Sequence, residues 1–208
     1  MAIENFFQIR AEKQSHIVDA AFAVFGRQGY KKASLSDIAK EAGITKGMIT
    51  YYFGSKKNLY LYLVNVSWTM LTQVGEKKAS LADMDFFQKL RIMIDIQISA
   101  IREHPAMISF VNSLYVEADP DVADDIAQTC ETIERHYNEF LLAEAGASPF
   151  KSGVDSRLIC KFVNWASGGF MEELFEIKST DSRIDTMAAD FYKCLDLMKQ
   201  AFYEGDNP

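Results

Sequence analysis

The chain is poor in cysteine and proline, with three cysteines and four prolines among 208 residues. Cys130, Cys160 and Cys194 stand at least thirty positions apart and form no CxxC pair. This spacing excludes a disulfide framework and a zinc site built from paired cysteines. It favours reduced thiols in a cytoplasmic protein.

Long apolar runs are also lacking. The longest, residues 59–66 and 92–101, are short or interrupted by polar side chains, and a membrane span needs roughly 18 apolar residues. The opening segment MAIENFFQIRAEKQ has no basic stretch leading into an apolar one, so we do not expect a secretory signal. With 49% apolar residues, the chain is expected to fold around a substantial core, without a membrane partner.

Sequence motifs of catalysis are absent as well. There is no HExxH, P-loop, GxSxG or glycine-rich dinucleotide turn. A helical di-iron enzyme requires Glu-x-x-His pairs, but lysine, isoleucine and isoleucine stand three positions before His16, His104 and His136. The histidines have no other metal-ligand spacing. We therefore expect no enzyme activity, no metal site and no cofactor.

Apolar residues recur at helical spacing along almost the whole chain, and no alternating β-branched run appears. The sequence therefore predicts an all-α protein of about nine helices. Gly29 can end the first helix in a left-handed conformation, and His104-Pro105 separates two later ones. The helices are expected near residues 17–29, 35–42, 45–52, 55–78, 84–103, 106–117, 121–145, 154–177 and 183–203.

The stretch SLSDIAKEAGITKGMITYYFGSKK, which begins at Ser34, predicts two short helices joined at a glycine. Ser34 is a good N-cap, and Gly43 supplies the positive φ that a tight turn between helices requires. Ala39 is small where two helices joined by so short a turn must cross closely. This is helix-turn-helix geometry, and it covers about residues 34–53.

The formal charge of −7 is unevenly distributed along the chain. Residues 1–60 carry nine Lys and Arg against five Asp and Glu, whereas residues 61–208 carry thirteen against twenty-four. A basic head on an acidic body favours approach of the head to phosphates. A net +4 over sixty residues is also common on solvated surfaces, so charge alone does not decide between the two interpretations.

Residues 9–63 resemble the DNA-binding head of the TetR (tetracycline repressor)/AcrR family of bacterial transcriptional regulators. The resemblance is carried by AAFAVFGRQGY, DIAKEAGI, TKGMITYYF and SKKNL, which follow one another in this order. It implies an N-terminal three-helix DNA-binding domain, residues 1–54. A long fourth helix would join it to a C-terminal ligand-binding and dimerisation domain, residues 55–208.

The chain departs from the family pattern inside the second helix of the motif. A tyrosine commonly stands where this chain has Thr50, and a small polar residue often stands where it has Met48. Thr50 is shorter than tyrosine and reaches less far. We therefore expect the operator to differ from those of close relatives.

The resemblance places the start of the second motif helix in a DNA major groove, with Lys46 reading guanine and Gly47 allowing close backbone approach. Hydroxyl groups and Lys56 would donate to phosphates. Two positions have a purely structural alternative, since Ser34 caps its helix with or without DNA and Tyr52 suits the core. The predicted DNA contacts are Ser34, Ser36, Thr45, Lys46, Gly47, Thr50, Tyr51, Tyr52 and Lys56.

The C-terminal part is expected to form a homodimer and to bind a small organic ligand, as the resemblance implies. The alternative for both residue sets is an ordinary intrachain core. The predicted dimer contacts are Leu158, Phe162, Gly168, Gly169, Ile184, Met187, Phe191, Leu195 and Met198. The predicted ligand pocket consists of Trp68, Met93, Gln97, Met107, Phe110, Tyr115, Tyr137, Asn164 and Trp165.

These observations predict a DNA-binding transcriptional regulator. We expect a repressor that binds a palindromic operator as a dimer and is released when the ligand shifts the fourth helix. One alternative is a helical dimer that acts through protein partners without binding DNA, and the other is a helical-bundle enzyme.

Overall fold

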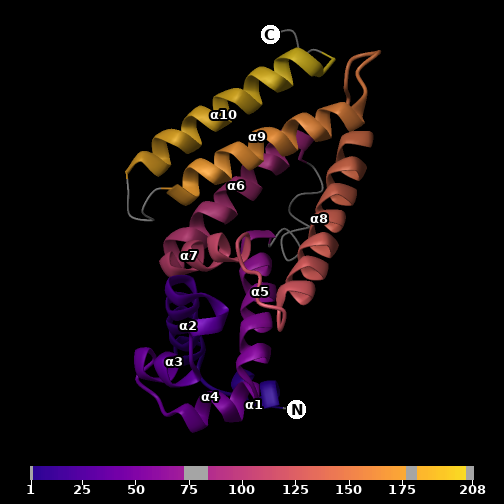
Figure 1. Ribbon diagram of the computed structural model, residues 1–208. Helices are drawn as coiled ribbons and strands as arrows, with labels where there is room; N and C mark the ends of the chain where they lie inside the picture. The colour runs from indigo at the N-terminus through magenta and orange to yellow at the C-terminus, as the bar shows by residue number, and fades with distance from the viewer. Residues whose placement is uncertain (1, 73–83, 177–181, 205–208) are drawn as a thin grey trace. The chain divides into compact units, whose positions relative to one another are not determined.

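The computed structural model describes residues 2–72, 84–176 and 182–204, and within these ranges the chain folds into helices joined by turns and loops (Figure 1). The one β pairing in the described ranges is an isolated antiparallel bridge between Phe150 and Tyr203. The predicted all-α class is confirmed. The helices are α1 (Ala2–Phe7), α2 (Ala11–Lys32), α3 (Leu35–Glu41), α4 (Lys46–Phe53), α5 (Lys56–Thr72), α6 (Phe86–Glu103), α7 (Pro105–Leu114), α8 (Ala123–Gly146), α9 (Ser156–Glu176) and α10 (Arg183–Phe202).

Local sequence features set most of these boundaries. Gly29 adopts a φ of 69° and kinks the end of α2, as expected of a left-handed glycine. Proline opens α7 directly after His104, which confirms the predicted break. The sequence analysis missed α1 altogether. The predicted continuation of α5 to residue 78 lies outside the described residues.

The chain divides into two compact units. The first unit contains Met1–Thr69 and Glu103–Glu131, and the second contains Met70–Arg102 and Thr132–Pro208. The first unit therefore includes α7 and the beginning of α8 in addition to the N-terminal helices. The division into a DNA-binding domain ending at residue 54 and a ligand-binding domain stays a functional prediction.

The core of the first unit is an aromatic cluster between α2, α5 and α7. The ring of Phe110 lies 5.2 Å from that of Phe22 and 5.2 Å from that of Tyr60, and all three side chains are buried. At Gly26 the α2 backbone meets α7 so closely that an added Cβ would lie 2.8 Å from the backbone N of Phe110. Glycine is thus required here by helix contact.

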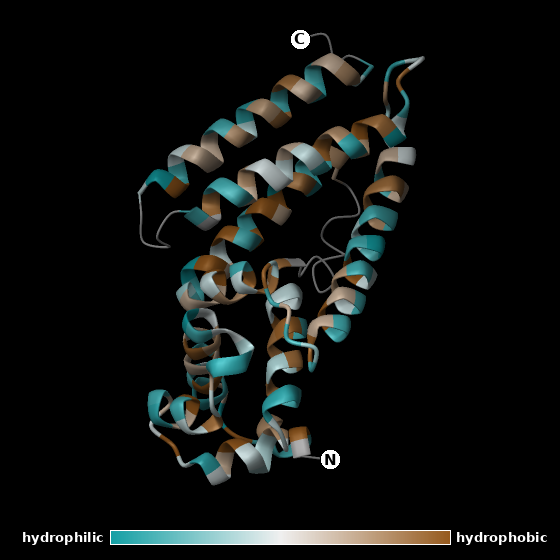
Figure 2. Cartoon of the chain, viewed as in Figure 1, coloured by the Kyte–Doolittle hydropathy of each residue, from teal (hydrophilic) through white to brown (hydrophobic). Residues whose placement is uncertain are grey.

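The second unit consists of α9, α10, nearly all of α6, the part of α8 from Thr132 onward and the last described residues of α5. The buried apolar residues of α10 recur every three or four positions, so the helix is amphipathic, and Figure 2 shows hydrophobic and hydrophilic residues interspersed along it. Its apolar side packs on α9 through the rings of Phe170 and Phe191, 4.7 Å apart. Arg91 of α6 also forms a 2.6 Å ion pair with Asp196 of α10. In the described ranges, no helix has the length and hydropathy that a membrane span requires.

Replacing Gly26 by alanine is expected to lower the free energy of unfolding by about 1–3 kcal/mol, because the new methyl group meets backbone atoms that cannot rotate away. Gly47→Ala is the matched control, since its Cβ would find no atom nearer than 3.8 Å. This control should be neutral or stabilising by up to about 1 kcal/mol. Urea unfolding of the two variants checks the prediction, which equal stabilities would contradict.

The stability of the first unit should also depend on pH through His104. Its Nδ1 lies 2.6 Å from Oδ1 of Asp19 on α2, and the hydrogen bond to this carboxylate raises the pKa of His104, while burial opposes the rise. The stabilisation is therefore complete below the unfolded-state pKa of about 6.5 and is lost as the pH rises through the higher folded-state pKa. Urea unfolding across this pH range should show the fall in the free energy of unfolding. The Asp19→Asn variant should lack this pH dependence. A wild-type stability that changes with pH as that of Asp19→Asn does would contradict the assignment.

Candidate nucleic-acid interface

The two helices of the motif are capped by their own side chains. Oγ of Ser34 accepts a 3.1 Å hydrogen bond from the backbone N–H of Asp37, which confirms the predicted N-cap of α3. Gly43 turns the chain with a φ of 63°, as predicted. Oγ1 of Thr45 then caps α4 by accepting from the N–H of Met48 at 3.3 Å. Local sequence thus determines where both helices begin.

Apolar residues fix α4 against the rest of the first unit. Ile49 and Phe53 are buried, and so are Ile38 and Ala39 of α3. Small Ala39 fits the close crossing that the short turn imposes. The buried stripe orients α4 so that its opposite side faces solvent.

The solvent side of α4 is formed by residues predicted to contact DNA. Thr45, Lys46, Gly47 and Thr50 are exposed, and 60% of the Tyr51 surface is accessible. A Cβ built on Gly47 would meet Oγ1 of Thr45 at 3.8 Å, an ordinary contact, and Gly47 does not have a positive φ, so the fold itself does not require glycine there. A cation, a phenol and an open backbone therefore share one accessible surface, which suits a phosphate-rich partner with readable edges.

The side chains of two predicted DNA-contacting residues already have partners within the protein. Tyr52 is only 5% exposed, so in the free protein it is a core residue, which is the structural alternative given above. The ammonium group of Lys56 donates to the carbonyl oxygens of Tyr30 and Ala33 at 2.9 and 3.3 Å, and it lies 4.2 Å from the centre of the Tyr30 ring. Because Lys56 holds the end of α2 to the start of α5, we leave it out of the interface proposed below.

The serines of α3 differ in the same way. Oγ of Ser34 also donates to the Asp37 carboxylate at 2.6 Å, so this hydroxyl already has two partners. Ser36 is exposed on the first turn of α3. Ser36 remains available for a phosphate contact, whereas Ser34 serves as a cap.

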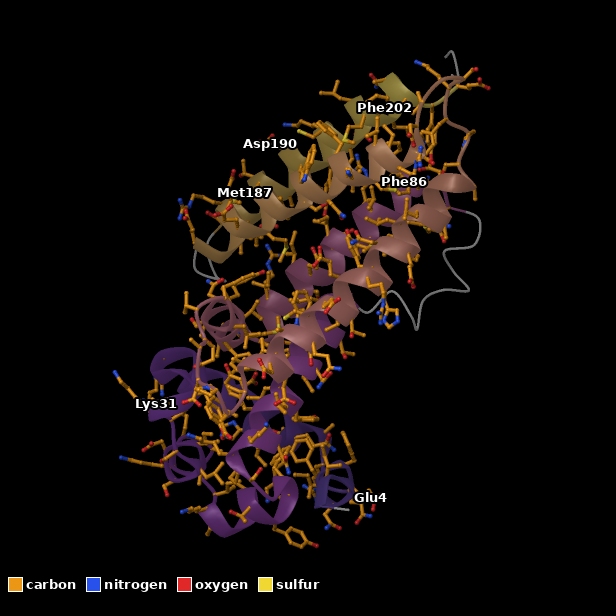
Figure 3. All side chains as sticks on the ribbon, turned by 45° about the vertical axis from the view of Figure 1, so that its right-hand side comes forward. Glu4, Lys31, Phe86, Met187, Asp190 and Phe202 are labelled. Carbon is orange, nitrogen blue, oxygen red and sulfur yellow. The ribbon has the colours of Figure 1, made fainter. Side chains whose placement is uncertain are left out.

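The sequence analysis overlooked two lysines near this surface. Lys31 and Lys32 are exposed in the last turn of α2, just before the N-terminus of α3, and Figure 3 shows Lys31 at the edge of the first unit. Lysine in a last helical turn also complements the helix dipole, so the pattern alone gave no sign of a phosphate contact. Their place in the structure adds positive charge beside α3.

Hydrogen bonds and an ion pair also join the end of α2 and the start of α5 to the segment that follows α7. The hydroxyl of Tyr30 donates to Asp121 at 2.6 Å, and Glu117 accepts from the backbone N–H of Tyr30 at 2.8 Å. Desolvation, followed by the hydrogen bond to Asp121, raises the pKa of Tyr30. Lys57 forms a 2.7 Å ion pair with Asp125 at the start of α8. Because these partners are far apart in sequence, no local pattern could have identified them.

The predicted pocket residues are divided between the two units. Trp68, Met107, Phe110 and Tyr115 belong to the first unit. Of these, Phe110 and Met107 are buried within the α2–α7 core, whereas Tyr115 is 75% exposed at the end of α7. Because two of these residues lie in the packed core and one lies at the surface, we leave all three out of the proposed ligand site.

The other predicted pocket residues lie in the second unit. Trp165 is 73% exposed and lines no interior site. Met93 is buried on α6, and the Oε1 atom of Gln97 is buried without a hydrogen-bond partner in the described part of the chain. Asn164 of α9 donates to Asn138 of α8 at 2.6 Å. Burial raises the pKa of Tyr137 on α8 to about 12.

The predicted dimer residues separate by helix. Leu158 and Phe162 are exposed on α9, as is Trp165 one turn further along, which was predicted for the pocket. Gly168 and Gly169 follow on this helix, and in the described part of the chain no atom beyond the adjacent residues and the backbone of α9 itself lies within 4 Å of a Cβ built on either. These positions form an accessible apolar stripe on α9.

On α10, most of the predicted dimer residues face the interior of their own chain. Ile184, Phe191, Leu195 and Met198 are buried, and Met187, labelled in Figure 3, is half-buried. One amphipathic stripe cannot serve both the core and a partner, so we remove these five from the proposed contact surface. The exposed large apolar residue of α10 is instead Leu197, with 64% of its surface accessible.

Known proteins match both the sequence of the motif and the fold. Residues 17–63 match the family described as bacterial regulatory proteins, tetR family. The chain is 24% identical to the HTH-type transcriptional repressor KstR of Mycobacterium tuberculosis over 130 residues, 62% of this chain and 59% of KstR. It is 43% identical to the HTH-type transcriptional regulator AcrR of Shigella flexneri over 49 residues, 24% of this chain and 23% of AcrR. These matches span about three-fifths and about a quarter of the two relatives.

The fold extends the similarity to nearly the whole chain. The crystal structure of the transcriptional regulator FadR from Bacillus subtilis in complex with stearoyl-CoA has a TM-score of 0.64 and 19% identity, covering 86% of this chain and 96% of FadR. KstR and AcrR are described as regulators, in agreement with the expectation that this chain is not an enzyme. Residues 17–63 thus match the tetR family of bacterial regulatory proteins in sequence, and most of the chain is similar to FadR in fold.

Proposed function

We propose that this protein is a transcriptional repressor that binds a palindromic operator in the cytoplasm as a homodimer. The observation that carries the proposal is the accessible surface of α4, where Lys46, Gly47 and Tyr51 lie together on a helix held from behind by buried residues. The N-terminal end of such a helix fits the major groove and presents Lys46 to base edges. Ser36, Lys31 and the exposed hydroxyls of α4 would contact phosphates on either side.

The apolar stripe on α9 supports a dimer. Leu158, Phe162 and Trp165 place large apolar side chains in water, which burial against a second copy would relieve. The open space at Gly168 and Gly169 allows another helix to approach closely. A two-fold dimer matches a palindromic operator, because each subunit reads one half-site.

The second unit is the proposed sensor of a small organic ligand. Buried Met93 offers an apolar contact, and the unpaired Oε1 of Gln97 would accept a hydrogen bond from a ligand donor. Tyr137 and Asn164 add polar groups on α8 and α9. We infer a mainly apolar ligand with one or more hydrogen-bond donors. Its binding would release DNA only if it favours an arrangement of the dimer that fits the operator poorly.

A binding-site selection from random DNA duplexes with the full-length protein tests DNA recognition directly. The selected duplexes should share a palindrome, and their affinity should fall steeply with salt because lysines neutralise phosphates. Gel shifts at two salt concentrations check both properties. Recovery of no common sequence, with no salt-sensitive binding, would refute the repressor proposal.

Lys46→Ala should reduce discrimination between the selected duplex and a scrambled one by about 1–3 kcal/mol, because a base contact is lost. Lys31→Ala is the matched control, since it removes an equal charge from a position suited to phosphate. It should weaken binding to both duplexes alike and reduce the salt slope by roughly one. Fluorescence anisotropy titrations measure both effects. Equal discrimination by the two variants would contradict the role given to Lys46.

Phe162→Glu should raise the dissociation constant of the dimer by at least about tenfold, because a carboxylate would be buried without a partner in the interface. Leu142→Glu places the same charge at a residue of α8 that is 42% exposed and lies outside the proposed surface. Sedimentation velocity should show monomers for the first variant and dimers for the second. A wild-type protein that is monomeric at micromolar concentration would contradict the proposed dimer.

A further inference from the structure

The short helix α1 inserts one aromatic side chain beside the DNA-reading helix. Phe6 is fully buried, and its ring lies 4.8 Å from that of Phe53, 5.8 Å from that of Tyr52 and 5.7 Å from that of Tyr62. Phe53 and Tyr52 form the end of α4, and Tyr62 lies on α5. A residue outside the helix-turn-helix motif therefore fills the joint between α4 and α5.

Tertiary contacts hold α1 in this place. A helix of six residues has little stability of its own, so its order depends on packing. The side-chain amide of Gln14 on α2 donates to the carbonyl oxygen of Ile9 at 2.8 Å and fixes the turn between α1 and α2. The segment containing Phe6 is thus anchored to α2 while it contacts α4 (Figure 1).

The recognition helix α4 is held at its C-terminal end by α5 as well, where Nδ2 of Asn58 donates to the carbonyl oxygen of Phe53 at 3.1 Å and the ring of Tyr62 lies 5.3 Å from that of Phe53. It contains eight residues and stops at Gly54, whose φ of 76° turns the chain into α5. Within the first unit α4 packs on α3 and on α1. The contact with α3 positions the N-terminal half of the motif, whereas Phe6 fills the space beside Tyr52 and Phe53. The tilt of α4 depends on both.

We propose that α1 clamps the recognition helix in the orientation needed for base reading, with Phe6 as a positioning residue. The inference rests on the proposed DNA-binding function and adds a determinant of specificity to it. Contacts to base edges tolerate displacements of only about 0.5 Å, whereas phosphate contacts carry no sequence information. Loss of the clamp therefore lowers binding to the operator more than binding to unrelated DNA.

The ratio of affinities for the selected duplex and a scrambled duplex distinguishes this role from a general contribution to folding. A variant that is partly unfolded loses the same fraction of active protein toward both duplexes, so its ratio stays constant. A variant with a misoriented α4 loses operator affinity selectively. Phe6→Ala is expected to reduce the ratio by at least about tenfold, the value of one good base contact.

Phe7→Ala is the matched control, because Phe7 is the same residue type on the same helix but is 57% exposed. Its ratio should stay within about twofold of the wild-type ratio. Phe6→Leu keeps apolar volume without the ring and should give an intermediate ratio. If Phe6→Ala does not fold, Phe6→Leu decides the matter. An unchanged ratio in the folded Phe6 variants would overturn the inference.

Amide hydrogen exchange in the free protein provides a test that does not require DNA. In the Phe6 variants, exchange should accelerate in Lys46–Phe53 more than in Pro105–Leu114, which belongs to the α2–α7 core of the same unit. Equal acceleration in both helices, or none, would contradict the clamp. If wild-type protein shows no selective DNA binding, the proposed function fails while this measurement still tests the clamp.

Discussion

The first unit depends on the close contact between α2 and α7, where the backbone at Ser109 and Phe110 leaves no room for a side chain on Gly26. Around this contact the aromatic rings of both helices close the core, and at the far end of α2 the phenol and backbone N–H of Tyr30 bind carboxylates beyond α7. Of this pair, α2 packs on α3, and α3 in turn packs on α4. A motif of fifteen helical residues in two pieces gains from this packing the fixed geometry that groove recognition requires.

Features decided within a few residues could be predicted from the sequence. The cap at Ser34, the kink at Gly29 and the turn at Gly43 depend on a side-chain oxygen or on a missing Cβ, and all three are as expected. The exposed surface of α4 also follows locally, because Ile49 and Phe53 at helical spacing leave Lys46 and its neighbours on the other side. These short-range rules account for the fold class and for most of the candidate interface.

Features that depend on distant partners could not be predicted in this way. The helix α1 is too short to show a period, and the ammonium of Lys56 is occupied only because two carbonyl groups at the end of α2 lie nearby. On α10 the spacing of Phe191 and Leu195 showed an apolar stripe but not whether it faces the chain itself or a partner. The same ambiguity applies to Phe110, which was predicted for the pocket and is buried in the aromatic core of the first unit. Periodicity identifies a buried face without naming what covers it.

The open surroundings of Gly47 separate the demands of folding from those of DNA binding. Near the start of α4 a glycine weakens the helix, and neither its φ nor any neighbouring atom in the described chain requires it. A residue that costs stability and serves no packing purpose indicates a constraint imposed from outside the protein. Under the proposed DNA contact, position 47 is a natural site for engineering new operator preferences, since the fold itself accommodates a side chain there.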